Sequence, residues 1–232
     1  MRIDVITLFP AMFNGFAGES MMKRASDLGA VRMRTIDPRD FARDARRTVD
    51  DRPYGGGPGM LMKPEPLFEA IESVLSPEAH VILMAPAGRR FTQADARRLA
   101  KMRHLILVCG HYEGIDERVR TALVDETLSI GDYVLTNGTL PAAVVADAVV
   151  RLLPGVLGGG EDATASESFT DNLLEYPQWT RPPVFRGMKV PKILQDGDHG
   201  KVAAWKRKTA LAVTGKRRPD LLAGTAAGKK EN

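Results

Sequence analysis

Cysteine is nearly absent from this sequence of 232 residues, since Cys109 is the only one. A single cysteine excludes a disulfide framework and a zinc site built from several cysteines. Cys109 ends an apolar run, so we expect it to be a buried packing residue. The four histidines show no spacing typical of metal ligands. The sequence therefore predicts no tightly bound metal ion such as zinc or iron.

Long hydrophobic runs are also missing. The first six residues read Met-Arg-Ile-Asp-Val-Ile, with an acid at Asp4, which fits neither a signal peptide nor a membrane anchor. We therefore expect a soluble cytoplasmic protein with no membrane partner. The dinucleotide-binding fingerprint and the phosphate-loop lysine motif are absent as well. Residues 55–59 are glycine-rich, and both a weak phosphate cradle and a shaped loop at an interface stay open for them.

Positive charge is concentrated near the C-terminus. With 44% hydrophobic and 27% charged residues, the composition is that of a globular protein with one large or two small domains. Residues 172–232 hold 13 Lys and Arg against 5 Asp and Glu, a balance of +8, whereas residues 1–171 have a balance of −4. Such a basic segment indicates an appendage that binds a polyanion or, alternatively, a solvated helical face.

Hydrophobic periodicity predicts strands that alternate with helices. Strands are expected at residues 2–9, 31–36, 81–85, 105–108 and 127–130, and helices at 11–28, 65–75, 92–101, 116–123, 142–153 and 201–213. This alternation is typical of βαβ units and predicts an α/β fold with a mainly parallel sheet. The glycine-rich, polar stretch at 158–166 predicts a flexible linker, and residues 224–232 a disordered tail.

Small or rigid residues follow three of the predicted strands, at 85–88, Gly110 and Gly131. Ligands of parallel sheets bind beyond the carboxyl ends of the strands, where glycine lets the backbone approach a ligand closely. These positions predict a small-molecule site, with plain tight turns as the alternative. Residues 129–138 place glycines around one aromatic and several apolar residues, a pattern that offers backbone donors and an apolar wall to a flat heterocycle.

Four strings carry a family resemblance: Tyr-Glu-Gly-Ile-Asp-Glu-Arg (112–118), Ile-Gly-Asp-Tyr-Val-Leu (130–135), Leu-Pro-Gly-Val-Leu-Gly (153–158) and Thr-Arg-Pro-Pro-Val-Phe-Arg-Gly-Met-Lys-Val-Pro (180–191). These strings occur in the order and spacing of the bacterial tRNA (guanine N1)-methyltransferase family, which the chain closely resembles from Ile3 to about Lys208. The resemblance implies a SPOUT-type α/β domain with a parallel sheet and a trefoil knot, followed by a small, mainly α-helical C-terminal domain.

The resemblance also implies a division of the chain by function. It assigns residues 1–157 to a knotted catalytic domain that binds S-adenosylmethionine, and 158–171 to a flexible linker that acts as a lid. Residues 172–223 become a basic helical domain that binds tRNA, and 224–232 the tail.

The family transfers a methyl group from S-adenosylmethionine to N1 of the guanosine immediately 3′ of the anticodon (position 37) in tRNA. The resemblance implies this activity and an obligate homodimer with active sites at the subunit interface. Mg²⁺ assists parts of the family and is a further candidate cofactor, although no residue argues for it independently. Position by position, the residues that match the cofactor pocket are Leu83, Met84, Pro86, Gly110, Ile130, Gly131, Asp132, Tyr133, Val134, Leu135 and Gly138.

Methylation of guanine N1 needs a base for the N1 proton, and a cation near O6 stabilises charge that develops on the ring. In the family this cation is an arginine that closes the knot helix, which Arg151 matches; a charge interacting with the helix dipole is the simpler interpretation. The family's base is the aspartate of an Asp-Ser-Phe string, whereas this chain has Glu167-Ser168-Phe169 after a linker one residue longer. We assign Glu167 as general base, with a solvated linker acid as the alternative, and Glu113 as a catalytic residue at the pocket mouth.

The resemblance assigns contacts with the substrate RNA to several residues at the pocket mouth, in the linker and in the basic C-terminal segment. Phosphates bind Lys and Arg without reading sequence, and specificity comes from an exposed loop base. Asp116, Glu117 and Arg118 instead charge the start of a helix and pair with the partner chain. His111 stands where Arg or Lys is usual. The substrate-binding residues implied are Tyr112, Ser168, Lys189, Lys192, Lys206 and Arg207.

Two other functions are compatible with parts of the sequence. A non-catalytic RNA-binding or ribosome-associated protein would explain the basic segment and the glycine loops, but not Arg151 and Glu167 near an intact cofactor string. A different knotted methyltransferase, acting on ribose or another base, would not need an arginine and a carboxylate aimed at a ring nitrogen.

Overall fold

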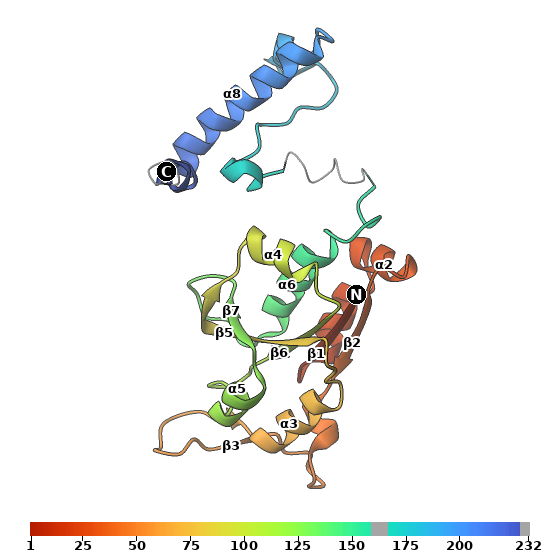
Figure 1. Ribbon diagram of the computed structural model, residues 1–232, viewed down its shortest axis with the longest axis vertical. Coiled ribbons are helices and arrows are strands. Elements are labelled where there is room, and N and C mark those ends of the chain that lie inside the picture. The colour runs from red at the N-terminus through yellow and green to blue at the C-terminus, as the bar shows by residue number, and fades with distance from the viewer. Residues whose placement is uncertain (159–166, 228–232) are drawn as a thin grey trace. The chain divides into compact units, whose positions relative to one another are not determined.

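Five parallel strands form the sheet of the first of two units, Met1–Gly160, in the computed structural model of the chain (Figure 1). They are β1 (Arg2–Ile6), β2 (Arg32–Ile36), β5 (Ala79–Arg90), β6 (His104–Cys109) and β7 (Glu126–Ser129). Their order is β2-β1-β6-β5-β7, and every neighbouring pair is parallel. All five overlap the predicted strands, so the prediction of an α/β fold with a parallel sheet is confirmed.

The structure describes residues 1–158 and 167–227. The second unit is Glu161–Asn232, and its placement relative to the first is not determined. Each unit is therefore described by itself. Most of the predicted linker, at 159–166, and the end of the predicted tail, at 228–232, lie outside the described residues.

Helices cover both faces of the sheet (Figure 1). One face packs against α1 (Pro10–Ala17), α2 (Ser20–Asp27), α4 (Gln93–Leu99) and α6 (Thr139–Val150), and the other against α3 (Pro64–Glu72) and α5 (Glu117–Leu123). Because successive strand residues point to opposite faces, Ile82 and Met84 join the first core while Val81 and Leu83 join the second. Both faces of the strands are apolar, as expected for a parallel sheet buried between two layers.

The single helix predicted at residues 11–28 is wrong, because the chain forms two helices there. α1 ends at Ala17 with Gly18 as its C-cap, and Glu19 has an extended backbone before α2 begins. Ser20 itself has φ of 50°, outside the right-handed helical region. The apolar residues keep a helical spacing across this break, so periodicity alone did not reveal it.

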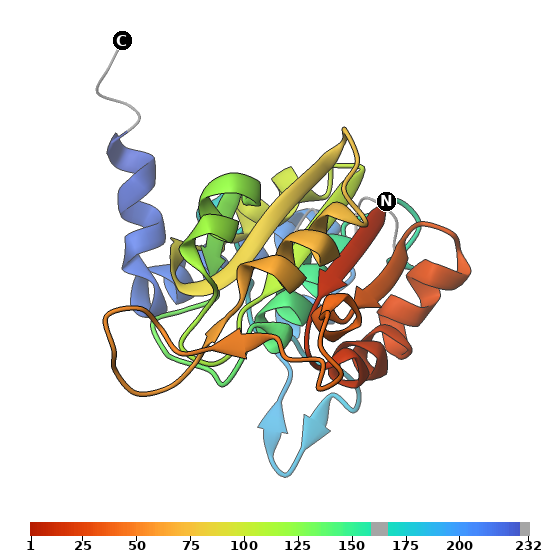
Figure 2. The same cartoon turned by 90° about the horizontal axis from the view of Figure 1, so that it is seen from below.

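A small antiparallel pair was not predicted. It joins β3 (Asp50–Asp51) to β4 (Leu61–Met62), and the loop between them contains the glycine-rich residues 55–59. This orange loop is conspicuous in Figure 2. Four of its glycines have positive φ, a conformation that glycine adopts without steric cost. A short 3₁₀ helix, η1 (Pro38–Phe41), precedes the pair.

The second unit contains α8 (His199–Arg217), α9 (Pro219–Ala227), the hairpin of β8 (Val184–Phe185) and β9 (Met188–Lys189), and the 3₁₀ helices η2 (Thr170–Asn172) and η3 (Lys192–Leu194). The hairpin is light blue in Figure 2. The buried Thr214 joins α8 to the preceding segment, since its Oγ accepts from the Leu174 N–H at 2.8 Å. Helix α9 extends to Ala227 and therefore includes the first four residues of the predicted tail.

Candidate active site

A pocket of about 230 Å³ lies beyond the carboxyl ends of β5, β6 and β7. Its lining comes from residues 83–86, 110–115 and 128–138, with Asp132 absent, and from Pro141 at the start of α6. Parallel sheets bind ligands at this edge.

The first wall of the pocket is a break in the pairing of β5 with β7. Met84 is opposite Leu128, the register then shifts, and Arg89 is opposite the same Leu128. The residues between them bulge out of the ladder. Gly88 makes the bulge possible, because a Cβ there would lie 2.6 Å from the Leu128 backbone nitrogen. This geometry turns Leu83, Met84 and Pro86 into pocket lining.

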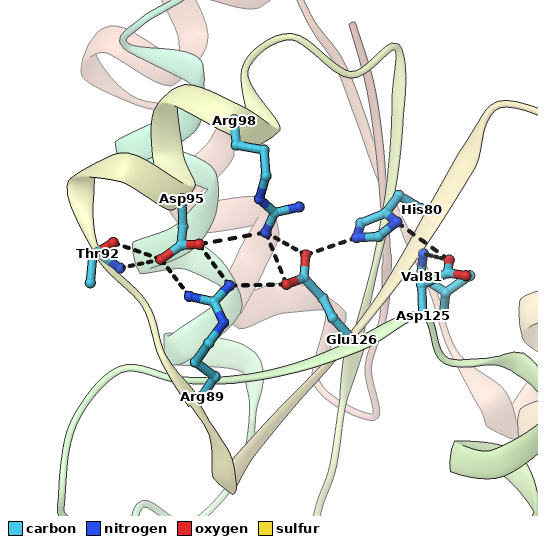
Figure 3. Close-up of polar contacts among 8 residues, drawn as sticks. All are labelled: His80, Val81, Arg89, Thr92, Asp95, Arg98, Asp125 and Glu126. Carbon is cyan, nitrogen blue, oxygen red and sulfur yellow. Dashed lines mark hydrogen bonds and ion pairs between the residues drawn. The ribbon is translucent and has the colours of Figure 1, made fainter. Parts of the chain in front are cut away.

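A network of charged side chains fastens this wall to α4 (Figure 3). Arg89 donates to both Asp95 oxygens at 2.7 and 2.9 Å, and Arg98 donates to both oxygens of Glu126 at 2.7 and 2.9 Å. The hydrogen bonds from Arg89 hold the pKa of Asp95 well below its usual range. Asp95 also closes a capping box with Thr92 at the start of α4.

Glu126 connects the same network to β5. Burial alone would raise the pKa of Glu126, but hydrogen bonds from Arg98 and His80 lower it. The His80 Nε2 atom lies 2.8 Å from the Glu126 carboxylate. Strand β7, at the edge of the sheet, is therefore tied to its neighbours by ion pairs as well as by its ladder. Sequence reasoning missed this network, although the spacing of Thr92 and Asp95 is a visible capping signal.

The second wall is the segment 130–138, which returns from β7 to the end of β6. The Gly138 N–H donates to the Gly110 carbonyl at 2.8 Å, and the His111 Nδ1–H donates to the Thr136 carbonyl at 2.9 Å. A side chain at Gly138 has no room, since a Cβ there would lie 2.8 Å from the Cys109 Cα. The hydrogen bond from His111 was not predicted, because nothing in the sequence indicated that its acceptor would be the Thr136 carbonyl.

Cys109 itself is a buried packing residue, as predicted, with 3% of its surface exposed. Burial raises the pKa of its thiol to about 12. The thiol therefore stays protonated and contributes packing rather than nucleophilic chemistry.

All but one of the predicted cofactor-binding residues lie in the pocket lining. The exception is Asp132, which instead forms an exposed ion pair with Arg90. The segment around it is held in shape by Gly131, because a Cβ at that position would collide with the Tyr133 ring. Those lining the pocket are Leu83, Met84, Pro86, Gly110, Ile130, Gly131, Tyr133, Val134, Leu135 and Gly138.

Tyr112 and Glu113 also line the pocket. Burial and the neighbouring Asp50 raise the pKa of Tyr112, so its hydroxyl is a hydrogen-bond donor at neutral pH. The Glu113 N–H donates to the Met60 carbonyl at 3.0 Å, and the Glu113 side chain occupies the space that a side chain at Gly59 would need. The glycine-rich loop is therefore shaped around a pocket residue.

Asp116 is the N-cap of α5, in agreement with the expectation that it places charge at the start of a helix. Its side chain accepts from the Arg118 N–H at 2.9 Å and forms an ion pair with the Arg118 guanidinium at 2.8 Å. Glu117 pairs with Arg120 on the same helix. These acids thus have partners within the chain.

Arg151 is at the end of α6 that is far from the pocket. Gly138, the N-cap of α6, and Pro141 line the pocket, whereas Arg151 is the C-cap and does not. With twelve residues, the helix spans about 18 Å. Within one chain, the structure therefore does not bring Arg151 to the pocket.

Glu167 and Ser168 belong to the second unit. Glu167 lines a hollow of about 270 Å³ there, together with Tyr176, Lys206 and Arg207. The Ser168 hydroxyl accepts from the Glu175 N–H at 3.0 Å. The two other predicted RNA contacts are Lys189 on β9 and Lys192 in η3.

Metal ligands do not gather at either hollow. Among residues 1–158 and 167–227, no group of three or more His, Cys, Asp or Glu side chains is arranged to hold an ion. In the same part of the chain, no helix combines the length and apolar character needed to span a bilayer.

Fold and pocket together define an α/β domain with an open pocket at the carboxyl edge of its parallel sheet. A family model described as tRNA (Guanine-1)-methyltransferase TrmD matches residues 1–224. The chain belongs to this family of methyltransferases.

Named relatives cover nearly the whole chain. It is 56% identical over 224 residues to the tRNA (guanine-N(1)-)-methyltransferase of Geobacillus kaustophilus. The matched region covers 96% of this chain and 91% of the relative. The protein of the same name from Moorella thermoacetica is 55% identical over 227 residues, covering 96% and 90%. That of Thermomicrobium roseum is 54% identical over 229 residues, covering 97% and 85%.

Proposed function

We propose that this enzyme transfers a methyl group from S-adenosylmethionine to N1 of the guanosine immediately 3′ of the anticodon, position 37, in tRNA. The observation that carries the proposal is the pocket built from residues 83–86, 110–115 and 128–138 in a chain of this family. The relatives named above are tRNA (guanine-N(1)-)-methyltransferases, which supports guanine in tRNA as the methyl acceptor.

The lining of the pocket is suited to S-adenosylmethionine in two respects. Gly110 and Gly138 have no side chains, so a ligand can approach the backbone closely there, and apolar side chains such as Leu83 and Leu135 also line the pocket. When bound, S-adenosylmethionine supplies a methyl group on a positively charged sulfur. The pocket lining would hold the cofactor, and Tyr112 and Glu113, which also line the pocket, would hydrogen-bond the guanine.

Two side chains complete the proposed chemistry. Glu167 accepts the proton from guanine N1, so that the ring nitrogen has an electron pair for the methyl group. Arg151 stabilises the negative charge that develops on O6. In this assignment, Glu113 orients the base and Ser168 positions the segment that carries Glu167.

The position of Arg151 supports a site shared between two subunits. Because α6 separates Arg151 from its own pocket by about 18 Å, an antiparallel second copy is the simplest way to bring this arginine to a pocket. Leu140 and Val144, one turn apart on α6, are 53% and 47% exposed, and Val134 on the pocket wall is 82% exposed. Such an apolar surface favours a partner. We therefore include a homodimer with the active site at the subunit interface.

The second unit has the charge expected of an RNA-binding surface. Several of its cations make no ion pair with any residue that the structure describes. Unpaired cations of this kind attract phosphates and release their counterions. They include Lys189, Lys192 and Arg207, named above as RNA contacts, together with Arg181, Lys208, Lys216 and Arg217.

The segment after Glu167 has an unusual backbone, which supports a lid that changes shape when RNA binds. Phe169, Asp171 and Asn172 have φ of 72°, 52° and 57°, and such left-handed conformations in residues other than glycine concentrate at functional segments. Family membership also supports the trefoil knot in the catalytic domain and action on tRNA in the cytoplasm. No residue is assigned to magnesium.

Methyl transfer from labelled S-adenosylmethionine to two tRNA transcripts tests the proposal. One transcript has guanosine 3′ of the anticodon and its twin has adenosine. Label on the guanosine version alone is expected. Label on both would mean another target nucleotide, and failure to bind S-adenosylmethionine in calorimetry would favour a non-catalytic RNA-binding protein.

A further inference from the structure

Three aromatic rings, those of Tyr176, Trp179 and Trp205, gather on the second unit. Tyr176 and Trp179 precede the β8–β9 hairpin, whereas Trp205 belongs to α8. The ring centroids of Trp179 and Trp205 are 5.7 Å apart, and those of Tyr176 and Trp205 are 6.2 Å apart. Trp179 is nevertheless 42% exposed. A large ring packed against a second ring thus offers apolar surface to solvent.

Cations surround these rings. Lys201 and Lys208 lie at i−4 and i+3 from Trp205, so they share its face of α8. The Lys206 ammonium lies 4.9 Å from the centroid of the Tyr176 ring. Lys201 pairs with Asp198 at 3.0 Å, while Lys208 makes no ion pair with a residue in the described part of the chain. Exposed aromatic rings among cations are typical of surfaces that bind unpaired nucleic acid.

We propose that Trp179 stacks on an unpaired base of the RNA substrate, supported by Trp205, while Lys201 and Lys208 contact neighbouring phosphates. The inference rests on the proposed function, because it takes tRNA as the partner. Anticodon loops offer unpaired bases, and an enzyme that modifies a loop base must draw that base out of its stack. Stacking of the Trp179 ring on a neighbouring base would stabilise such an opened loop.

The charge of this surface favours RNA over a second copy of the chain. In a symmetric dimer each subunit contributes the same patch to the interface. Two copies meeting at Trp179 would therefore bring Lys201, Lys206 and Lys208 of both chains together, and like charges at an interface oppose association. A polyanion with exposed bases can stack its bases on the rings and pair its phosphates with the cations.

Intrinsic fluorescence tests the inference directly, because Trp179 and Trp205 are the only two tryptophans of the chain. The full-length protein is titrated with an RNA hairpin that has the anticodon loop, and separately with a fully paired duplex of equal phosphate count. The hairpin is expected to quench tryptophan emission, and the duplex to bind through its phosphates without quenching. Hairpin binding that leaves the emission unchanged would overturn the inference.

Substitutions separate stacking from charge. Trp179→Ala should weaken hairpin binding about tenfold without changing the dependence of affinity on salt, whereas Trp179→Phe should retain most of the affinity. Lys208→Ala, the matched control, should reduce the slope of log affinity against log salt by about 1. Circular dichroism checks the fold of each variant, and if Trp179→Ala does not fold, the wild-type quenching decides.

Two further outcomes would count against the inference. Trp179→Ala that binds the hairpin as tightly as wild type would leave the proposed methyltransferase intact but remove the stacking role. A change of oligomeric state in Trp179→Ala, seen by analytical ultracentrifugation, would assign the surface to a second copy instead. Failure of the wild-type protein to bind either RNA would contradict both this inference and the proposed substrate, although binding of S-adenosylmethionine would be unaffected.

Discussion

Gly138 lies against Cys109 so closely that a Cβ at Gly138 would come within 2.8 Å of the Cys109 Cα. Through this contact the segment 130–138 is seated on the end of β6, and the Gly138 N–H bonds to the Gly110 carbonyl at 2.8 Å. The pocket therefore depends on the absence of a side chain at one position. Its φ of −80° is open to any residue, so space rather than backbone conformation selects glycine here.

Replacing Gly138 with alanine should push the segment 130–138 away from β6 and weaken binding of S-adenosylmethionine by at least about tenfold, since misplacement by about 1 Å strongly impairs a preformed site. Calorimetry measures the effect. Gly15→Ala is the matched control, because Gly15 lies in α1 with open space around its Cβ position. Equal affinity of both variants would show that the segment tolerates displacement.

Replacing Arg151 with alanine should lower the rate of methyl transfer about 10²–10³-fold, the loss typical when one donor to a developing oxyanion is removed. Binding of S-adenosylmethionine should stay unchanged, because Arg151 does not line the pocket. Single-turnover assays measure the rate, and calorimetry the binding. A parallel loss of cofactor affinity would indicate that Arg151 supports the fold of α6 instead.

Mixed dimers can show whether Arg151 acts on the partner's pocket. A dimer of one Arg151→Ala subunit and one Gly138→Ala subunit keeps one intact pocket and, on the other subunit, one intact arginine. If the arginine acts across the interface, such a dimer has one complete site of two and about half of wild-type activity. If it acts within its own chain, the mixed dimer is as inactive as either parent.

Replacing Glu167 with glutamine removes the proposed base without changing its size. Methyl transfer should fall about 10²–10⁴-fold, whereas the affinities for tRNA and S-adenosylmethionine should change little. Glu167→Asp, which keeps the carboxylate, should recover much of the activity. Equal rates for Glu167→Gln and wild type would assign the proton transfer to another group, and Glu113→Gln would be the next variant to measure.

Asp95 should make the stability of the first unit depend on pH. Its pKa in the folded protein is lowered, chiefly by hydrogen bonds from Arg89, below the unfolded value of about 3.9. The stabilisation is therefore complete above about pH 5 and is lost progressively as the pH falls through the unfolded value toward the folded one.

Denaturant unfolding of wild type and Asp95→Asn between about pH 6 and pH 3 checks this expectation. Wild type should be more stable at the upper end, and the difference in free energy of unfolding should shrink as the pH falls. A difference that stays constant would mean that Asp95 contributes through the capping box geometry rather than through its charge.

The sequence predicted the parts of the fold that depend on local pattern. Strand β6 could be read from the apolar run that ends at Cys109, and its carboxyl end from Gly110. The break between α1 and α2 could not be predicted, because the apolar spacing continues across it, while the backbone becomes extended at Glu19 and left-handed at Ser20. The order of the strands depends on contacts between distant segments, which periodicity does not contain.

The candidate site divides in the same way. Gly110 and Gly131 were visible as strand-end signals, and Gly138 as the last glycine of the segment 129–138. The structure places all three in one pocket. The ion pair of Arg98 with Glu126, at 2.7 Å, was not foreseeable, because the two residues are brought together only when β7 takes its place beside β5. The distance of Arg151 from the pocket likewise depends on the tertiary fold, because the fold puts the N-terminal end of α6 at the pocket.

The chemical identity of the methylated nucleoside tests the central claim most directly. After reaction with S-adenosylmethionine, the tRNA is digested and its nucleosides are separated and identified by mass spectrometry against standards. The account predicts N1-methylguanosine, derived from the guanosine immediately 3′ of the anticodon. A 2′-O-methylated nucleoside, or a methyl group on another base, would contradict the roles assigned to Glu167 and Arg151 and favour a methyltransferase of different target.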